Sequence, residues 1–155
     1  MAKIVIPAHR DHLFRLANNM AQADRDECTA MAMEPHSALE NALSKSFAAW
    51  TGMVNDEPVC MFGVVPAGGL LGGVGTPWFS ATPELQRHRV SFIKACRRHL
   101  EMMLDIFPLL VDFVDVQHKS AIRWLSWLGF EVATAPVPFG PFKMPFLKFE
   151  KHRGS

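Results

Sequence analysis

Residues 114–130 read VDVQHKSAIRWLSWLGF, and this stretch does most to decide the fold. It begins in a short apolar strand, expected over Leu109–Val116, and passes through a polar turn. Apolar residues then recur at helical spacing, which predicts a helix over Lys119–Leu128. Gly129 follows at the position where helices commonly end in a left-handed residue. A further strand is expected over Phe130–Ala133.

The region before this stretch predicts the longest helix of the chain. Thr82 can cap its first turn, Pro83 suits the first helical position, and Glu84 complements the helix dipole. Apolar residues then fall on one face, at Leu85, Phe92, Ile93, Cys96, Leu100, Met103, Leu104 and Phe107. Pro108 ends the helix, because proline disfavours helical backbone in the residue before it.

The N-terminal third predicts one strand and three helices. The strand is expected over Lys3–Pro7, and an amphipathic helix begins at about His9. Its outer face is expected to carry His12, Arg15, Asn18 and Asn19. Ala23–Met33 is interpreted as a turn leading into a second short helix. Pro35 then interrupts the chain before a third helix over Ser37–Phe47.

The remaining segments predict mainly strands. Ala48–Val54 and Pro58–Val65 are expected to form a hairpin around a polar turn. A glycine-containing turn leads into Leu70–Phe79, a strand weakened or bulged at its glycines, Gly72, Gly73 and Gly75. Pro136–Pro145 contains four prolines and is interpreted as a long loop. Phe146–Glu150 is expected to be the last strand.

This order of elements predicts a mixed α/β fold in a single domain over residues 1–155. The strand–helix–strand crossover in the middle requires parallel pairing there, whereas the hairpins are antiparallel. We therefore expect a mostly antiparallel sheet with a central parallel crossover and helices on both faces. The order alone is compatible with several folds.

Composition excludes several classes of protein. Of 155 residues, 49% are hydrophobic and 20% charged, so a disordered chain is excluded. The formal net charge of +1 gives no reason to expect nucleic acid as a partner. No apolar run reaches the roughly 18 residues that span a bilayer, and the first residues do not resemble a signal peptide. These features predict a cytoplasmic protein without a membrane span.

Cysteine and histidine give no metal pattern. The three cysteines, Cys28, Cys60 and Cys96, are widely spaced, which is typical of reduced thiols. His9 and His12 are three residues apart without further ligands nearby, so we interpret them as ordinary surface histidines and expect no metal site. The chain contains no tyrosine, so a mechanism that needs a tyrosine hydroxyl is excluded.

The whole chain resembles the GNAT acyltransferases. In that family a Q/R-x-x-G-x-G/A loop at the start of the long helix holds the pyrophosphate of acyl-CoA through backbone N–H groups. The matching segment here reads Gln86, Arg87, His88, Arg89, Val90 and Ser91. The resemblance implies acetyl-CoA as cofactor, in a groove that also includes Gly75, Trp78 and Ala121.

Two residues of this loop differ from the family pattern. Arg89 replaces the first glycine and Ser91 the second small residue, so the backbone is less free to approach a phosphate. Arg87 and Arg89 could instead bind phosphate through their guanidinium groups. Alternatively the two arginines bind some other phosphorylated ligand, the site no longer takes CoA, or these residues are the solvated first turn of a helix.

The family pattern N-x-x-A-x-x-x-Y-x-x-x-G-F covers residues 118–130. Ala121, Gly129 and Phe130 match it, whereas His118 and Leu125 replace the asparagine and the tyrosine. The tyrosine often protonates the departing thiolate, which leucine cannot do. His118 could donate that proton, or it could be a polar residue that caps the helix.

The resemblance places the amine acceptor near the segment before the second helix. Asp24 and Glu27 are the expected acceptor contacts, although such a run is also typical of a solvated turn. Glu57 and Asp115 are further carboxylates that could accept the amine proton. The acceptor itself is not identified by the sequence.

Four separated segments resemble one group of GNAT-like phage proteins more closely. They are QADRDEC, AWTGMVNDEPVCMFGV, LLGGVGTPWF and IRWLSWLGF. Members of this group are described both as acetyltransferases and as internal virion proteins of short-tailed phages. The resemblance therefore implies either an acyltransferase with a degenerate site or a non-catalytic assembly protein. The second alternative would use Phe139, Phe142 and Phe146 as anchors for other virion proteins, whereas in a simpler interpretation these side chains fold back over the core. A homodimer stays open in both alternatives.

Overall fold

The computed structural model describes residues 3–68 and 72–154. Their elements follow the order β1 (Lys3–Pro7), α1 (Arg10–Asn18), α2 (Gln22–Ala30), α3 (Pro35–Lys45), β2 (Ala48–Val54), β3 (Glu57–Pro66), β4 (Val74–Ala81), the 3₁₀ helix η2 (Pro83–His88), α4 (Arg89–Ile106), β5 (Leu109–Asp115), α5 (Lys119–Trp127), β6 (Glu131–Val132), β7 (Val137–Phe139) and β8 (Met144–His152). The mixed α/β class expected from the sequence is confirmed.

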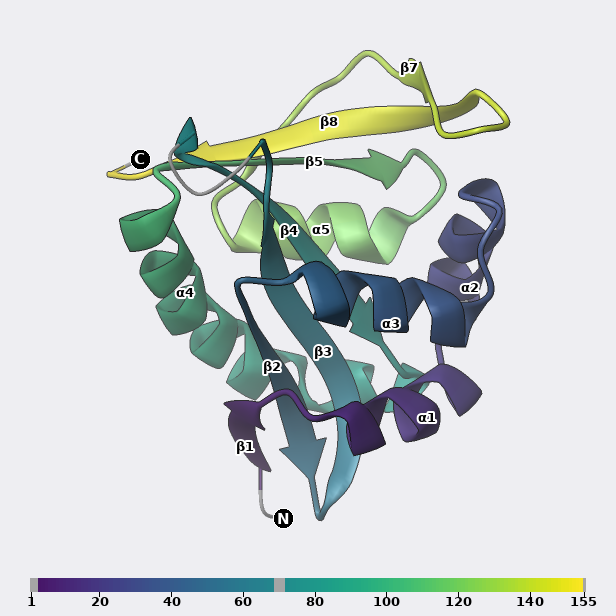
Figure 1. The fold of residues 1–155 in the computed structure, drawn as a ribbon, viewed down its shortest axis with the longest axis vertical. Coiled ribbons are helices and arrows are strands. Elements are labelled where there is room, and N and C mark those ends of the chain that lie inside the picture. Colours follow the sequence, from purple (N-terminus) through teal and green to yellow (C-terminus); the bar gives the residue numbers. More distant parts are fainter. Residues whose placement is uncertain (1–2, 69–71, 155) are drawn as a thin grey trace.

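Within these ranges the strands form one sheet in the order β1-β2-β3-β4-β5-β8-β6, with β7 paired to β8. The described pairs are antiparallel except β4 and β5, which are parallel. Pairing between β4 and β5 is recorded at Val74 with Leu109 and at Gly75 with Leu110. Figure 1 shows the two strands leaving this common point and diverging. The sheet is therefore split along most of β4 and β5.

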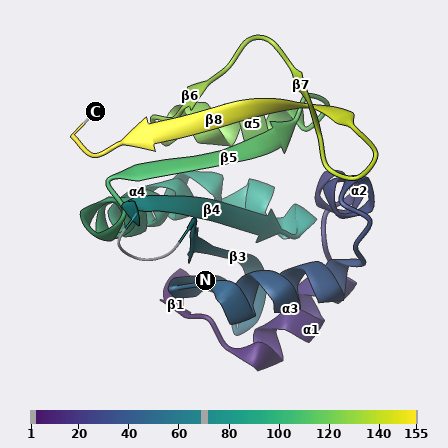
Figure 2. The ribbon, with the colours of Figure 1, turned by 45° about the horizontal axis from the view of Figure 1, so that its top comes forward.

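Helices cover both faces of the sheet, as expected. On one face α4 and α5 pack over a large core that includes Phe92, Phe107 and Trp124. On the other face α1 and α3 pack over a smaller core around Leu16, Leu39 and Met61. Figures 1 and 2 show α2 as a short helix beside the open end of the split. These layers bring α2, α4 and α5 together around the gap in the sheet.

The turn between β2 and β3 and the end of α5 were well predicted, because a few adjacent residues determine each of them. Asn55 and Asp56 both have positive φ angles, of 49° and 67°, as a tight hairpin turn between β2 and β3 requires. Gly129 has a φ of +90°, and the N–H groups of Gly129 and Phe130 donate to the carbonyls of Ser126 and Leu125. This pair of bonds closes helix α5 as predicted.

Two predictions about proline were wrong. Pro35 does not interrupt the chain but is the first residue of α3, where its missing N–H costs little. The segment 136–145 is not simply a loop, because Val137–Phe139 forms β7 and pairs antiparallel with Met144–Phe146. Proline is tolerated in β7 because the strand lies at an edge, where an N–H can be missing.

The strand before the long helix also differs from the prediction. It begins at Val74, after Gly72 and Gly73, and its register with β3 is continuous through Gly75, so it has no bulge. The register shift of the sheet lies instead between Gly52 and Met53, in the pairing of β2 with β3. Leu70 and Leu71, expected in this strand, and Gly69 lie outside the described residues.

Two polar residues are more buried than predicted. His12 does not lie on the outer face of α1 but is buried, and its Nδ1 lies 2.8 Å from Thr51 Oγ1. Thr82 does not cap a helix through its side chain; its hydroxyl is buried and donates to the Val59 carbonyl over 3.4 Å. In both cases contacts distant in sequence decide the orientation of the side chain.

Candidate functional site

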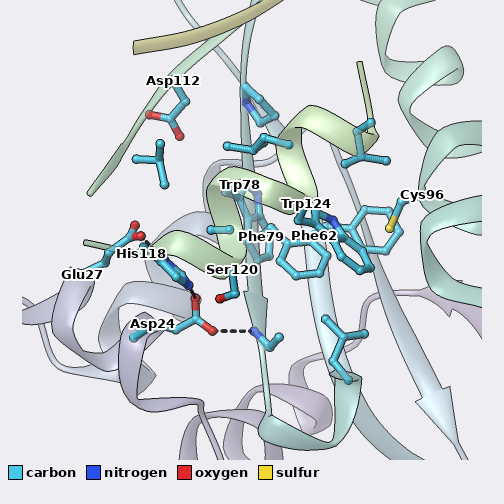
Figure 3. Close-up of a pocket in the computed structure, with 18 of the residues that line it drawn as sticks. Asp24, Glu27, Phe62, Trp78, Phe79, Cys96, Asp112, His118, Ser120 and Trp124 are labelled. Carbon is cyan, nitrogen blue, oxygen red and sulfur yellow. Dashed lines mark hydrogen bonds and ion pairs between the residues drawn. The ribbon is translucent and has the colours of Figure 1, made fainter. Parts of the chain in front are cut away.

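A cavity of about 280 Å³ occupies the gap between the diverging strands. Its lining comes from α2, β3, β4, η2, α4, β5, α5 and the strands that follow. Figure 3 shows the polar residues at one end and the aromatic residues at the other. Phe79 lies between Phe62 and Trp124, with ring centroids 6.1 and 5.3 Å away, and forms the centre of the aromatic part.

Trp78, a predicted groove residue, is fixed in the cavity wall. Its indole N–H donates to the Ser46 hydroxyl over 2.7 Å. Gly63 lies beside it on β3, and a Cβ atom there would approach Trp78 Nε1 to 2.9 Å and the Ala48 carbonyl to 2.7 Å. Glycine at this position is therefore needed for the indole to lie against the strand.

His118 is brought into the polar end by the turn between β5 and α5. The His118 N–H donates to the Asp115 carbonyl, and the Asp115 carboxylate accepts from the Gln117 N–H over 2.9 Å. His118 occupies the N-cap position of α5 but makes no capping hydrogen bond with its side chain. The interpretation of His118 as a helix cap is therefore wrong, because the ring is buried and turned toward α2.

Asp24 and Glu27 meet the two nitrogens of the His118 ring. They lie three residues apart on α2 and so share a face of the helix. Glu27 Oε1 is hydrogen-bonded to His118 Nδ1, and Asp24 Oδ1 lies 3.6 Å from Nε2. The other oxygen of Asp24 accepts the Ala81 N–H over 3.2 Å. This cluster joins α2, the end of β4 and the start of α5.

The electrostatics of the cluster favour a protonated imidazole. Burial acts to lower the pKa of His118, but the hydrogen bond to Glu27 and the charges of Glu27, Asp24 and Asp115 outweigh it. The pKa of His118 is therefore raised above 6.5. Burial also raises the pKa of Asp24 to about 6, against the opposing effects of His118 and the Ala81 N–H. The cluster can hold and exchange a proton near neutral pH.

Asp112 is a cavity residue that the sequence interpretation missed. It lies on β5, and one of its oxygens accepts the N–H of Phe113 over 2.8 Å. Burial raises the pKa of Asp112 to about 7, and the charge of Glu27 adds to this effect. The signal was present in the sequence, since a carboxylate inside the apolar run LLVDFV is unusual for a buried strand.

The remaining predicted residues separate into two groups. Trp78, Gln86 and Ala121 line the same cavity as Asp24, Glu27 and His118. Gly75 lies at the closed end of the split, where a Cβ atom would meet Val64, Leu110 and Phe107 at 2.6–3.0 Å. The lining does not include Arg87, His88, Arg89, Val90 or Ser91.

The start of the long helix is preceded by a 3₁₀ helix. Residues 83–88 form η2, in which the N–H groups from Leu85 onward donate to the carbonyl three residues earlier. The backbone amides toward the end of η2 are thus engaged within it. Arg87 and Arg89 are exposed, with Arg87 Nε 3.9 Å from Glu84 and Arg89 at 6.0 Å from the Trp127 ring centroid. An anion bound at this position would contact side chains more than free backbone N–H groups.

His88 lies at the junction of η2 and α4 and is 5% exposed. Neither ring nitrogen has a hydrogen-bond partner among the described residues, although Nε2 lies 3.4 Å from the Glu84 carboxylate. His88 was predicted as part of a phosphate loop, and in this arrangement its ring is buried and lies outside the lining of the cavity.

No metal site or membrane span is found in the part of the chain that the structure describes. Residues 3–68 and 72–154 contain no group of three or more metal-ligating side chains. Cys60 and Cys96 are buried free thiols, and burial raises the pKa of both. No helix in these ranges is long and apolar enough to cross a membrane.

Comparison with known proteins identifies the fold. No protein-family model and no curated protein sequence matches the chain. Solved structures do match. A phosphinothricin acetyltransferase of the GNAT superfamily from Sinorhizobium meliloti, in complex with AcCoA, is similar with a TM-score of 0.72 and 13% identity. That match covers 98% of this chain and 89% of the other.

Two further structures give the same result. Spermidine N-acetyltransferase from Vibrio cholerae, in complex with CoA and spermine, has a TM-score of 0.69 and 13% identity, over 97% of this chain and 95% of its own. Ribosomal-protein-alanine N-acetyltransferase from Brucella melitensis has a TM-score of 0.69 and 13% identity. That match covers 96% of this chain and 99% of the other. Identities this low show the fold alone, and the fold is that of the GNAT acetyltransferases.

Proposed function

We propose that the protein is an acyl-CoA-dependent N-acyltransferase that works in the cleft between β4 and β5. One observation carries the proposal: His118 is buried between Asp24 and Glu27 at the polar end of a cavity that splits the sheet. A proton-exchanging cluster beside an apolar cleft is the arrangement that amine acylation needs, because the amine loses a proton as it is acylated and the leaving thiolate gains one.

The residues present fit acyl-CoA at its thioester end. When bound, it would supply the acyl group in an activated form, as a thioester. Pro77, Trp78 and Phe79 of β4 would hold the arm that carries the thioester, with Ser120 and Ala121 opposite on α5. Arg87 and Arg89, exposed at the start of α4, would hold the phosphates in place of backbone amides.

Strand β4 offers a backbone donor for the carbonyl of the acyl group. The Ala81 N–H points away from β3, because it donates to Asp24. N–H groups alternate along an antiparallel strand, so the N–H of Phe79, two residues earlier, points the same way. In a preorganised site such a donor would stabilise the negative charge that develops on the carbonyl oxygen.

The cluster would then move the protons. Asp24, with a pKa of about 6, is mostly ionised at neutral pH and would accept the amine proton on its carboxylate. His118 holds a proton at its raised pKa and would donate it toward the departing sulfur, the role for which Leu125 is unsuited. Transfer between Asp24 Oδ1 and His118 Nε2, 3.6 Å apart, would restore the starting state. Glu27 would keep the imidazole oriented.

Acetyl-CoA is the donor that the resemblance implies, and the acceptor is an amine that the carboxylates at the polar end would attract. The finer proposals are an origin in a phage or prophage, a site degenerate in its phosphate loop, and a place in the cytoplasm of the bacterial host. They rest on the sequence resemblance, together with the replacement of the glycine loop by η2.

A second candidate function is a non-catalytic virion or assembly protein on the same scaffold. The hairpin of β7 and β8 exposes Val137, Phe142 and Met144, which favours contact with another protein or with a second copy of the chain. Phe139 and Phe146 do not support it, since Phe139 stacks on Phe113 with centroids 4.4 Å apart and Phe146 is buried.

The direct test is release of the CoA thiol from acetyl-CoA in the presence of a panel of amines. We expect amine-dependent release by the unmodified protein, and a loss of about 10²–10⁴-fold in kcat for His118→Gln, because a positioned proton donor contributes that much. His36→Gln is the matched control, since His36 is exposed on α3. Thiol release that is equal in the unmodified protein and His118→Gln would contradict the proposed role.

A further inference from the structure

The cavity extends further into the core than an acetyl group requires. Its polar groups lie at one end, whereas its inner wall includes Leu100 and Met103 of α4 and Phe130 and Phe149 near the far strands. Phe107, the C-cap residue of α4 four positions beyond Met103, packs under Gly75 at the closed end of the split. Leu100 and Met103 therefore line the part of the cavity between the closed end and the polar cluster.

Packing principles argue against a purely structural origin for this space. Protein interiors are close-packed and contain few voids larger than a water molecule. Unfilled space lowers stability, because the lining atoms lose contacts. A cleft of about 280 Å³ whose inner end is lined by apolar side chains therefore points to an occupant. Figure 3 shows Phe62, Phe79, Cys96 and Trp124 grouped at this end, away from His118.

The chemistry of the inner wall restricts what that occupant can be. A charged amine would lose its hydration there without gaining a partner, so the acceptor belongs at the carboxylate end. A mostly hydrocarbon group would suit the apolar inner wall.

We propose that the inner cavity binds the acyl group of the donor, and that this group is an apolar chain longer than acetyl. The inference rests on the proposed function, since it assumes that a thioester lies in the β4–β5 cleft. A cavity of ~150 Å³ accommodates benzene. With about 280 Å³ shared with the thioester, the cavity suits an acyl chain of roughly four to eight carbons.

The test is calorimetric titration with CoA, acetyl-CoA and hexanoyl-CoA. Each buried methylene group is expected to tighten binding about fourfold. Hexanoyl-CoA, with four more methylenes than acetyl-CoA, should therefore bind at least about tenfold more tightly even if burial is incomplete. Equal affinities for acetyl-CoA and hexanoyl-CoA would overturn the inference while leaving the proposed function intact.

Two methionine variants test whether the acyl chain lies in the inner cavity. Met103→Phe places a bulkier, rigid ring in the wall and narrows the inner cavity, and the ratio of the acetyl-CoA to the hexanoyl-CoA dissociation constants should fall to within about threefold of one. Met102→Phe is the matched control, because Met102 is 51% exposed on the same helix, and it should keep the ratio of the unmodified protein. Thermal unfolding checks that both variants fold. A ratio unchanged in a folded Met103→Phe protein would overturn the placement of the chain.

S-hexanoyl-pantetheine, which lacks the nucleotide, separates the inference from the proposed function. If it binds while CoA does not, the acyl cavity is supported and the proposed dependence on CoA fails. If neither this compound nor any of the CoA esters binds, both the inference and the proposed function are overturned.

Discussion

At the scale of single residues, the proposed activity depends on one imidazole held between two carboxylates. His118 contributes its Nδ1 to Glu27 and its Nε2 to Asp24, and the Ala81 N–H fixes Asp24 in turn. The pKa of Asp24 is raised to about 6 and that of His118 above 6.5. The two groups are coupled, so a titration reports on the pair more than on either residue.

We predict a bell-shaped dependence of kcat/KM on pH. Activity should rise as Asp24 loses its proton near pH 6 and fall as His118 loses its proton above pH 6.5. Asp24→Asn should remove the rising limb and lower the maximum about 10²-fold or more. The measurement is the pH profile of thiol release. Asp26→Asn, at an exposed position on the same helix, is the control, and a profile unchanged in Asp24→Asn would contradict the assignment.

Part of this cluster was predicted from the sequence, but only through the resemblance to the GNAT acyltransferases. Asp24 and Glu27 were expected on the acceptor side, but nothing in the sequence showed that they meet His118, which lies 91 residues after Glu27. Asp112 was missed because its strand was treated as uniformly apolar. His12 was wrongly placed on the surface, since its bond to Thr51 joins elements that are distant in sequence.

At the scale of elements, predictions succeeded where short-range chemistry determines the structure. The end of α5 at Gly129 and the turn between β2 and β3 depend on a few adjacent residues with positive φ angles. The start of α4 was predicted six residues too early. Leu85 and His88 are buried, and this segment winds as the 3₁₀ helix η2 before the α-helix begins. Burial of this kind depends on the whole fold.

The start of α4 gives a prediction about phosphate binding. Arg87→Ala/Arg89→Ala should weaken CoA binding about tenfold or more, because bonds between guanidinium and phosphate are charge-assisted. Binding of S-hexanoyl-pantetheine, which lacks the nucleotide phosphates, should change less than twofold. Calorimetry on both ligands measures the difference.

Arg10→Ala/Arg15→Ala removes the same charge from α1 and serves as the control. Its pairs with Glu40 and Glu57 are surface contacts that contribute little to stability. Equal loss of CoA affinity in the two double variants would mean that general charge matters, and not contact at η2 and α4.

At the scale of the whole molecule, the folded chain holds protons that the unfolded chain would release. The pKa values of Asp24 and Asp112 are raised from 3.8 to about 6 and about 7, and that of His118 is raised above 6.5. The folded state therefore binds more protons between about pH 4 and 8, and its stability falls as pH rises. His12, whose pKa burial lowers, acts in the opposite direction below pH 6.5.

We therefore predict a lower melting temperature at pH 8 than at pH 5. The three groups with raised pKa values outweigh His12, whose pKa is lowered. Each kcal/mol lost from the free energy of unfolding lowers the melting temperature by about 2–4 °C for a chain of this size. Asp112→Asn removes the carboxyl group whose pKa is raised more than that of Asp24, and should flatten the dependence of the melting temperature on pH between pH 5 and 7. Scanning calorimetry at several pH values measures this. A melting temperature that rises from pH 5 to pH 8 would contradict the assignment of raised pKa values.

The overall sheet was predictable from the order of elements, but the cavity was not. Alternating strands, a long helix and a crossover restrict the topology to a mixed sheet, and the structure agrees. The cavity instead takes its lining from eight or more elements among the described residues, and its size depends on how far β4 and β5 diverge after Gly75. No local pattern in the sequence encodes that divergence.

The most direct test of the central claim is calorimetric titration of acetyl-CoA into the unmodified protein, Ala121→Phe and Ser126→Phe. Ala121 lines the cleft, whereas Ser126 is exposed on the same helix. We predict binding by the unmodified protein and Ser126→Phe, and a loss of affinity of at least tenfold in Ala121→Phe, because the new ring occupies the space of the thioester arm. No binding at millimolar acetyl-CoA, or equal binding by both variants, would contradict it.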